Sequence, residues 1–172
     1  LSSSKTAYAL ERAADNGIKS AVVSKKDFDS IESWDDAVLA AVEDSGAELI
    51  VLAGYLSLMG PKVVAKYSNR IINIHPALIP SFCGAGMYGI RPHQAALAKG
   101  VKVSGATVHF VNENYDEGPI LLQKAIDVLP NDTPETLQKR IMQECEWKIL
   151  PEAIRLIADG RVMIENNIAR VI

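Results

Sequence analysis

The sequence predicts an α/β protein with an open, mostly parallel sheet flanked by helices. Helix-like and strand-like segments alternate along the first half of the chain, which favours right-handed βαβ crossovers and parallel strands. The continuous apolar run at residues 48–53 is typical of a strand buried on both faces. With 172 residues, 48% of them hydrophobic, the chain has the size and apolar content of one domain with one core.

Apolar spacing in the first half of the chain defines the alternating elements. Apolar residues recur three and four apart in the helical segments, and the first helix ends at Asn16-Gly17, a common helix end. The strand segments are short apolar runs. We therefore expect helices at residues 6–17, 33–45 and 61–66, and strands at residues 18–23, 48–53 and 70–75.

The second half departs from this alternation. Residues 76–92 contain three prolines and three glycines, which predicts a long irregular loop. Such loops are uncommon unless they serve a function. A helix is expected at residues 93–99, and the segments 103–111 and 120–128 predict an antiparallel pair of strands at the edge of the sheet.

A long helix and a short strand complete the expected fold. Thr133 is suited to cap a helix that has proline at its first position and glutamate in its first turn. This helix should run to about Asp159, kink at Pro151 and be followed by a strand at residues 162–165. We expect both tryptophans, Trp34 and Trp147, in the core.

Charge and cysteine content restrict the function classes. The net charge is −3, whereas binding nucleic acid through bulk charge requires a basic surface. Two cysteines, Cys83 and Cys145, suggest no disulfide and fit a reducing compartment. The longest apolar run, at residues 49–56, is too short to cross a bilayer, and the first residues lack a signal-peptide core. We expect a cytoplasmic protein with neither a nucleic-acid nor a membrane partner.

Asn73 and His75 form the first candidate for chemistry. They are two residues apart in a predicted strand, so both side chains project from the same face. Open α/β sheets bind ligands at the carboxyl ends of their strands, and an amide donor beside an imidazole can stabilise an oxygen that gains negative charge. On spacing alone, it is equally plausible that the pair holds the strand end and the following loop.

Asp116 is the second candidate. It follows the strand that carries Thr107 and His109 on one face. A carboxylate that faces His75 would raise the pKa of the imidazole and could pass protons. Taken alone, Asp116 is more simply explained as a turn residue before Gly118-Pro119.

Three other patterns are weaker. The GxGxxG sequence at residues 84–89 does not directly follow a strand, so we reject a dinucleotide site and expect a flexible loop over a pocket. His93 is expected to begin a helix as an exposed or capping residue. The three histidines lack HExxH spacing and the two cysteines are far apart in sequence, so no metal site is expected.

Four segments share their pattern with one known family. Residues 72–80 read INIHPALIP, and residues 51–55, 104–111 and 116–120 read VLAGY, SGATVHFV and DEGPI. Together they resemble the signatures of the phosphoribosylglycinamide formyltransferases, a family of folate-dependent formyltransferases. The resemblance extends over nearly the whole chain. It implies a Rossmann-like fold, with residues 1–172 forming a single formyltransferase domain.

This resemblance implies a reaction. A formyl group would pass from 10-formyltetrahydrofolate, as co-substrate, to the amine of glycinamide ribonucleotide during purine synthesis, without a metal. Asn73 and protonated His75 would stabilise the tetrahedral oxyanion. Asp116 would keep His75 charged and relay a proton through water between the two nitrogens. We expect only small-molecule substrates as ligands, and a monomer or weak homodimer.

The same resemblance implies further site residues. One group would line the folate pocket: Leu56, Leu58 and Met59, with backbone groups of Asn112, Glu113, Asn114 and Tyr115. Thr107 and His109 would flank the catalytic centre. Pro76 and Glu146 would bind the nucleotide substrate, with Glu146 on the ribose hydroxyls. The Ile79–Pro80 bond would be cis.

The chain departs from the family pattern at its start and near Glu146. The family opens with a strand, a phosphate-gripping loop and a helix. This chain begins at the following junction, near residues 3–5, so we expect it to be truncated at the N-terminus relative to the family. Trp147 stands where the family has histidine. Formyltetrahydrofolate deformylase, methionyl-tRNA formyltransferase and a non-catalytic folate-binding remnant remain alternatives.

Overall fold

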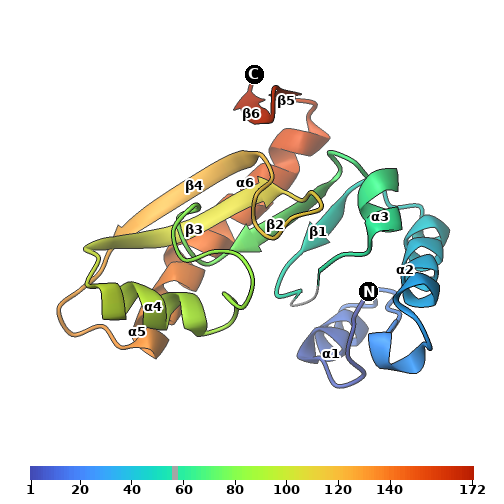
Figure 1. Cartoon of the computed structure of the whole chain (residues 1–172), viewed down its shortest axis with the longest axis horizontal. Helices are drawn as coiled ribbons and strands as arrows, with labels where there is room; N and C mark the ends of the chain where they lie inside the picture. Colours follow the sequence, from blue (N-terminus) through green and yellow to red (C-terminus); the bar gives the residue numbers. More distant parts are fainter. Residues whose placement is uncertain (56–57) are drawn as a thin grey trace. The chain divides into compact units, whose positions relative to one another are not determined.

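The computed structural model describes residues 1–55 and 58–172 (Figure 1). Contacts divide the chain into two compact units, which are described separately. The first unit comprises residues 1–50 and 57–67, and the second comprises residues 51–56 and 68–172. Within the described residues, no helix is both long and apolar enough to cross a membrane.

The first unit is helical. Its elements are α1 (Tyr8–Asp15), the short 3-10 helix η1 (Lys25–Asp27), α2 (Ile31–Ser45) and α3 (Pro61–Lys66). The Ser30 hydroxyl caps α2 by accepting a hydrogen bond from the Ser33 amide at 3.0 Å. Buried Asp35 accepts a hydrogen bond at 2.8 Å from the Lys62 amide at the start of α3. The three predicted helices are confirmed, and Trp34 lies in the core as expected.

The strand predicted at residues 18–23 is wrong. Among the described residues, Val22 pairs only with Ser2, in a single parallel bridge. A strand needs a neighbour that continues the ladder of backbone hydrogen bonds. The apolar run therefore remains extended chain rather than becoming part of a sheet.

The second unit contains a four-stranded sheet in the order β1-β2-β3-β4. The strands are β1 (Ile50–Leu52), β2 (Ile71–His75), β3 (Val103–Phe110) and β4 (Ile120–Asp127). The α/β, Rossmann-like fold class is confirmed. The antiparallel pairing of β3 with β4 is as predicted, but β2 also pairs with β3 in antiparallel direction, so the expectation of a mostly parallel sheet is wrong for these three strands.

The direction of β3 follows from the connection that precedes it. His75, at the end of β2, pairs with Thr107, whereas Ile72 pairs with Phe110. The irregular segment after β2 and α4 (Arg91–Lys99) therefore return the chain to the end of the sheet where β2 stops. A crossover to the opposite end would have made β3 parallel.

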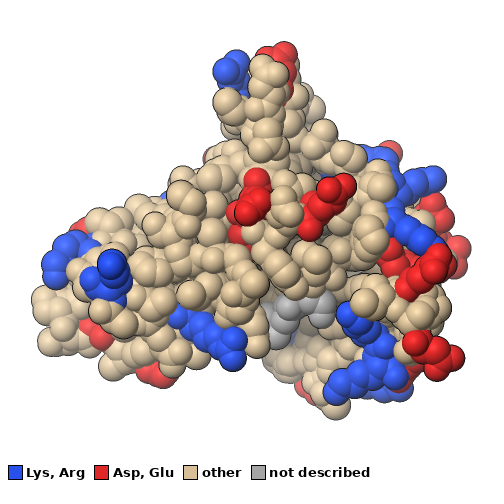
Figure 2. Space-filling model, viewed as in Figure 1, with Lys and Arg blue, Asp and Glu red and all other residues tan. Residues whose placement is uncertain are grey.

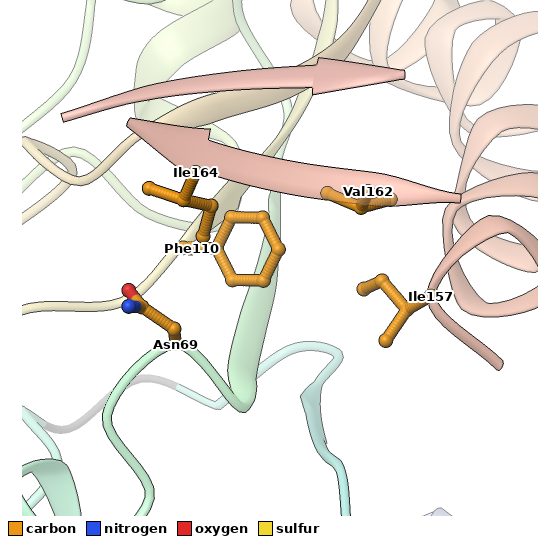
Figure 3. A pocket seen from close by; sticks show the side chains of 5 residues that line it. All are labelled: Asn69, Phe110, Ile157, Val162 and Ile164. Carbon is orange, nitrogen blue, oxygen red and sulfur yellow. The ribbon is translucent and has the colours of Figure 1, made fainter. Parts of the chain in front are cut away.

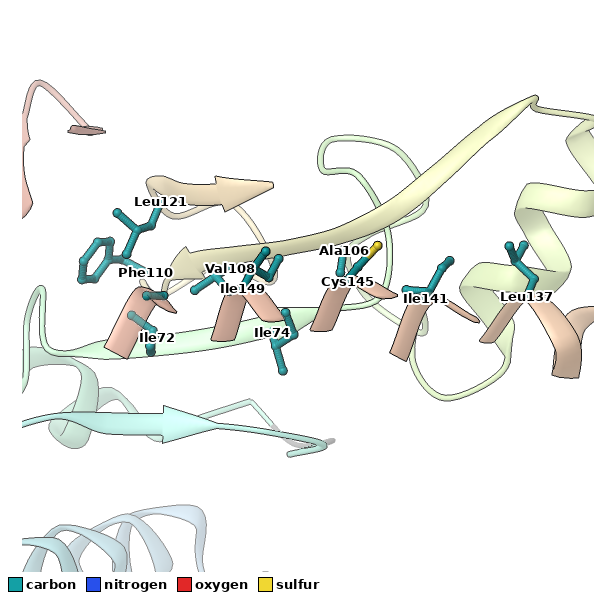
Figure 4. Packing of buried hydrophobic residues seen from close by; sticks show 11 residues of the cluster. Ile72, Ile74, Ala106, Val108, Phe110, Leu121, Leu137, Ile141, Cys145 and Ile149 are labelled. Carbon is teal, nitrogen blue, oxygen red and sulfur yellow. The ribbon is translucent and has the colours of Figure 1, made fainter. Parts of the chain in front are cut away.

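Helices pack on one face of this sheet and bury the core. They are α5 (Pro134–Ile141), the π-helix η2 (Met142–Glu146) and α6 (Trp147–Ala158). Figure 4 shows apolar side chains of these helices beside those of β2 and β3. The cluster comprises Ile72, Ile74, Ala106, Val108, Phe110, Leu121, Leu137, Ile141, Cys145, Ile149 and Ala153.

The π-helix explains two differences from the predicted long helix. The core positions Leu137, Ile141, Cys145 and Ile149 are four residues apart, a spacing that drifts around an ordinary helix with 3.6 residues per turn. The wider π turn keeps them on one face. The break from α geometry that the sequence did not predict lies at η2, and Pro151 lies within α6. Trp147 points away from this face and is 60% exposed, so its predicted core position is wrong.

The end of the chain forms a hairpin. The predicted strand at residues 162–165 is confirmed as β5 (Val162–Glu165), and β6 (Ile168–Val171) pairs with it in antiparallel register. Asn166 and Asn167 join the strands with φ values of 50° and 61°, as a tight two-residue turn requires.

Two surface features complete the description of the fold. A cavity of about 220 Å³ is lined by Asn69, Phe110, Ile157, Val162 and Ile164 (Figure 3), none of which is a predicted site residue. On the face shown in Figure 2, Lys and Arg side chains lie in several separate groups instead of one basic patch.

Candidate active site

Two neighbouring strands supply most of the candidate side chains. In the register of β2 and β3, Asn73 lies opposite His109 and His75 lies opposite Thr107. Directly opposed residues of an antiparallel pair share one face of the sheet. The Asn73 amide nitrogen is 3.2 Å from His109 Nε2. The sequence spacing and the pairing of β2 with β3 thus bring four polar side chains together.

Asp116 completes this cluster from the turn between β3 and β4. Its Oδ1 is 3.4 Å from His109 Nε2, and its Oδ2 is 3.6 Å from His75 Nδ1. Oδ2 also accepts a hydrogen bond from the Gly84 amide at 2.8 Å. Burial alone would raise the pKa of Asp116, but its close contact with His109, the hydrogen bond from the Gly84 amide and the nearby imidazoles lower it below the ordinary value. The carboxylate is therefore ionised at neutral pH.

His75 is held by the loop that follows its strand. Its Nε2 is 2.9 Å from the Phe82 carbonyl oxygen; because that oxygen only accepts, Nε2 carries a hydrogen. Burial lowers the pKa of His75 below its ordinary value, and the raising effect of Asp116 offsets only part of this. Burial therefore favours the neutral ring, while Asp116 favours the charged ring that the family resemblance implies.

The start of the irregular loop is fixed by Thr107. Its hydroxyl donates to the Ala77 carbonyl at 2.7 Å and accepts from the Ile79 amide at 3.1 Å. The Gln123 amide donates to both the Thr107 hydroxyl and the Ile79 carbonyl, each at 3.0 Å. The Ile79–Pro80 bond is cis, as expected. Gln123 was missed from the sequence because its role depends on the pairing of β3 with β4.

Replacing Thr107 with valine should destabilise the protein by about 2–3 kcal/mol. Valine keeps the volume but leaves buried backbone groups of Ala77 and Ile79 without partners. Urea unfolding measures this loss. The exposed Thr6 is a matched control, and Thr6→Val should change stability by less than about 0.5 kcal/mol. A similar small change in Thr107→Val would contradict the role given to its hydroxyl.

His93 is neither exposed nor a cap, contrary to the sequence prediction. It is 1% exposed in α4, and neither ring nitrogen has a hydrogen-bond partner among the described residues. Burial, followed by the effect of nearby His75, lowers its pKa from 6.5 to about 4. The ring is therefore neutral at physiological pH.

This lowered pKa predicts acid sensitivity. As the pH falls below about 6.5 the unfolded chain protonates His93 before the folded chain does, so stability declines until about pH 4. The 2.5-unit difference between 6.5 and 4 corresponds to about 3 kcal/mol. Urea unfolding at several pH values should show a smaller decline for His93→Leu than for the unmodified protein. Equal declines would contradict a neutral buried His93.

The remaining predicted site residues are more dispersed. Glu146 ends the π-helix, and burial raises its pKa. Pro76 is half-buried directly after β2, and Tyr115 is largely exposed in the turn that carries Asp116. In the first unit, Leu58 is 39% exposed and Met59 is buried, while Leu56 lies outside the described residues. Within the described part of the chain, no group of three or more His, Cys, Asp or Glu is arranged to hold a metal ion.

Comparison with known proteins identifies related chains. Residues 1–154 match the family described as Formyl transferase. The sequence is 43% identical over 153 residues to the chloroplastic phosphoribosylglycinamide formyltransferase of Arabidopsis thaliana, covering 88% of this chain. The match covers 52% of the plant protein, so this chain spans about half of that relative's length.

Solved structures show the same similarity. The glycinamide ribonucleotide transformylase 1 of Symbiobacterium toebii superposes with a TM-score of 0.92 at 42% identity, covering 98% of this chain and 77% of that one. A formyltetrahydrofolate deformylase from Pseudomonas syringae is more distant. Its TM-score is 0.83 at 29% identity, covering 94% of this chain and 52% of that one.

Proposed function

Because the chain belongs to the formyl transferase family, we propose that it transfers a formyl group from 10-formyltetrahydrofolate to the amine of glycinamide ribonucleotide. The observation that carries this proposal is the convergence of Asn73, His75 and Asp116 around His109. This cluster combines an amide donor, a titratable ring and an ionised carboxylate. These groups suit a reaction that creates an oxyanion and moves a proton.

The reaction begins with attack of the amine on the formyl carbon. The new C–N bond pushes the carbonyl electrons onto oxygen, and Asn73 donates a hydrogen bond to that oxyanion. His75 is neutral before substrates bind. When the oxyanion forms beside the His75 ring, it adds a second negative charge to that of Asp116. The two negative charges favour protonation of His75 as the intermediate forms.

Proton movement then allows the intermediate to collapse. The attacking nitrogen gives up a proton, and Asp116, acting through water, delivers a proton to the folate nitrogen. The C–N bond to folate breaks as the carbonyl re-forms. Asp116 is ionised at neutral pH, so its carboxylate is free to take part in this relay.

Other parts of the chain bind the substrates in this proposal. The raised pKa of Glu146 has burial as its cause, and ribose hydroxyls would supply the hydrogen-bond donors that its carboxylate needs. Pro76 contacts the same nucleotide. Folate binds at the turn that carries Asp116. In this proposal, residues 1–172 act as one formyltransferase domain in the cytoplasm, as a monomer or weak homodimer. Its ligands are small-molecule substrates, and neither nucleic acid nor a membrane is a partner.

Acceptor dependence tests the proposed function. The protein is incubated with 10-formyltetrahydrofolate alone, with glycinamide ribonucleotide or with tRNA, and release of tetrahydrofolate is followed. We expect rapid release only with glycinamide ribonucleotide. A comparable rate without any acceptor would instead establish a deformylase, the alternative favoured by the similarity to the Pseudomonas enzyme.

A further inference from the structure

His109 lies at the centre of the cluster. It is 2% exposed and sits on β3, opposite Asn73. Its Nδ1 is 2.8 Å from the Phe110 carbonyl oxygen. Its Nε2 faces two groups, the Asn73 amide nitrogen at 3.2 Å and Asp116 Oδ1 at 3.4 Å. One ring nitrogen therefore contacts both the donor and the carboxylate of the proposed reaction.

The Phe110 carbonyl determines which nitrogen of the neutral ring carries the hydrogen. A carbonyl oxygen only accepts, so Nδ1 holds the hydrogen and Nε2 has a lone pair. That lone pair accepts one hydrogen from the Asn73 amide. The amide has a second N–H, which remains available to a substrate oxygen. If the amide were turned over, its oxygen would face the Nε2 lone pair, and the two acceptors would repel each other.

We propose that His109 is a positioning residue for Asn73, holding the side-chain amide so that its nitrogen, and not its oxygen, serves the reacting oxyanion. The kinetic consequence rests on the proposed formyl transfer. The orientation itself follows from the hydrogen bonds of His109 to Phe110 and Asn73. A reversed amide would place its oxygen where the oxyanion forms and would oppose the reaction.

The polar groups that face His109 are Asn73 and His75 on β2, Asp116 in the turn and the Phe110 carbonyl. Ile120 of β4 lies opposite and offers no polar side chain. Asn73 therefore supplies the N–H that faces the Nε2 lone pair.

Two variants separate positioning from packing. His109→Phe fills the site but offers no acceptor, and we expect kcat to fall about 100-fold while KM stays within about threefold. Glutamine presents an acceptor oxygen and cannot be protonated near neutral pH. His109→Gln should recover at least about tenfold of the lost kcat. Equal kcat in the two variants would overturn the proposal.

Nitrogen NMR of the unmodified protein tests the orientation without an assay. At pH 8 we expect His109 to carry its hydrogen on Nδ1, with a coupling across the hydrogen bond between Asn73 Nδ2 and His109 Nε2. In His109→Phe, the coupling should be absent and the Asn73 amide signals should shift. A hydrogen on Nε2 at pH 8, or Asn73 signals that do not respond, would refute the inference. Failure of formyl transfer with the coupling intact would refute only the proposed function.

Discussion

Replacement of Asp116 by asparagine is expected to lower kcat for formyl transfer by about 10²–10⁴-fold, the range for loss of a general acid–base group. Asparagine has the same shape and can still accept the hydrogen bond from the Gly84 amide. It cannot take up the proton released by the attacking nitrogen, and it removes the negative charge beside His75. The substitution therefore removes the proton transfer and the charge of Asp116 while keeping its hydrogen bond to the loop.

Steady-state assays and thermal unfolding together measure this effect. The unfolding temperature of Asp116→Asn should stay close to that of the unmodified protein. Asp127, an exposed carboxylate on β4, provides the control, because Asp127→Asn removes the same charge outside the cluster. A kcat of Asp116→Asn within tenfold of that control would remove Asp116 from the proposed proton relay.

Removal of the His75 side chain should have an effect of similar size. His75→Ala deletes the ring that becomes charged beside the oxyanion, and loss of one such stabilising group lowers kcat by about 10²–10³-fold. KM should change much less, because this interaction exists mainly in the transition state.

A second substitution distinguishes loss of catalysis from a folding defect. His75 is buried, so alanine leaves a cavity. Glutamine fills more of that space and retains a donor for the Phe82 carbonyl, but it cannot become charged. His75→Gln should fold normally and still lose most of kcat. Near-normal turnover in either variant would show that His75 does not stabilise the oxyanion.

Much of the candidate site could be predicted from the spacing of residues within one strand. Asn73 and His75 share a face because strand side chains alternate, and a motif resemblance pointed to Asp116. Neither pattern indicates how strands pair. The antiparallel register that sets Asn73 against His109 depends on where α4 returns the chain, a property of the whole connection.

Burial was the property that the sequence predicted least well. His93 and Trp147 both stand in helices, where exposure depends on which face meets the sheet. Trp147 stands two residues from buried Cys145 and two from buried Ile149, so it lies on the opposite side of the helix. Core residues four apart are the pattern that places this side outward. The lowered pKa of His75 likewise reflects burial, which the spacing of charged residues in the sequence does not reveal.

A single-turnover experiment with ¹³C-labelled formyl tests the central claim most directly. Enzyme in excess over 10-formyltetrahydrofolate is mixed with glycinamide ribonucleotide, and the label is followed by NMR in the unmodified protein and in Asp116→Asn. We predict that the label moves quantitatively to the nucleotide amine with the unmodified protein, and at least about 100-fold more slowly with the variant. Label released as formate, or transfer at equal rates in both proteins, would contradict the proposal that this cluster carries a formyl group between two nitrogens.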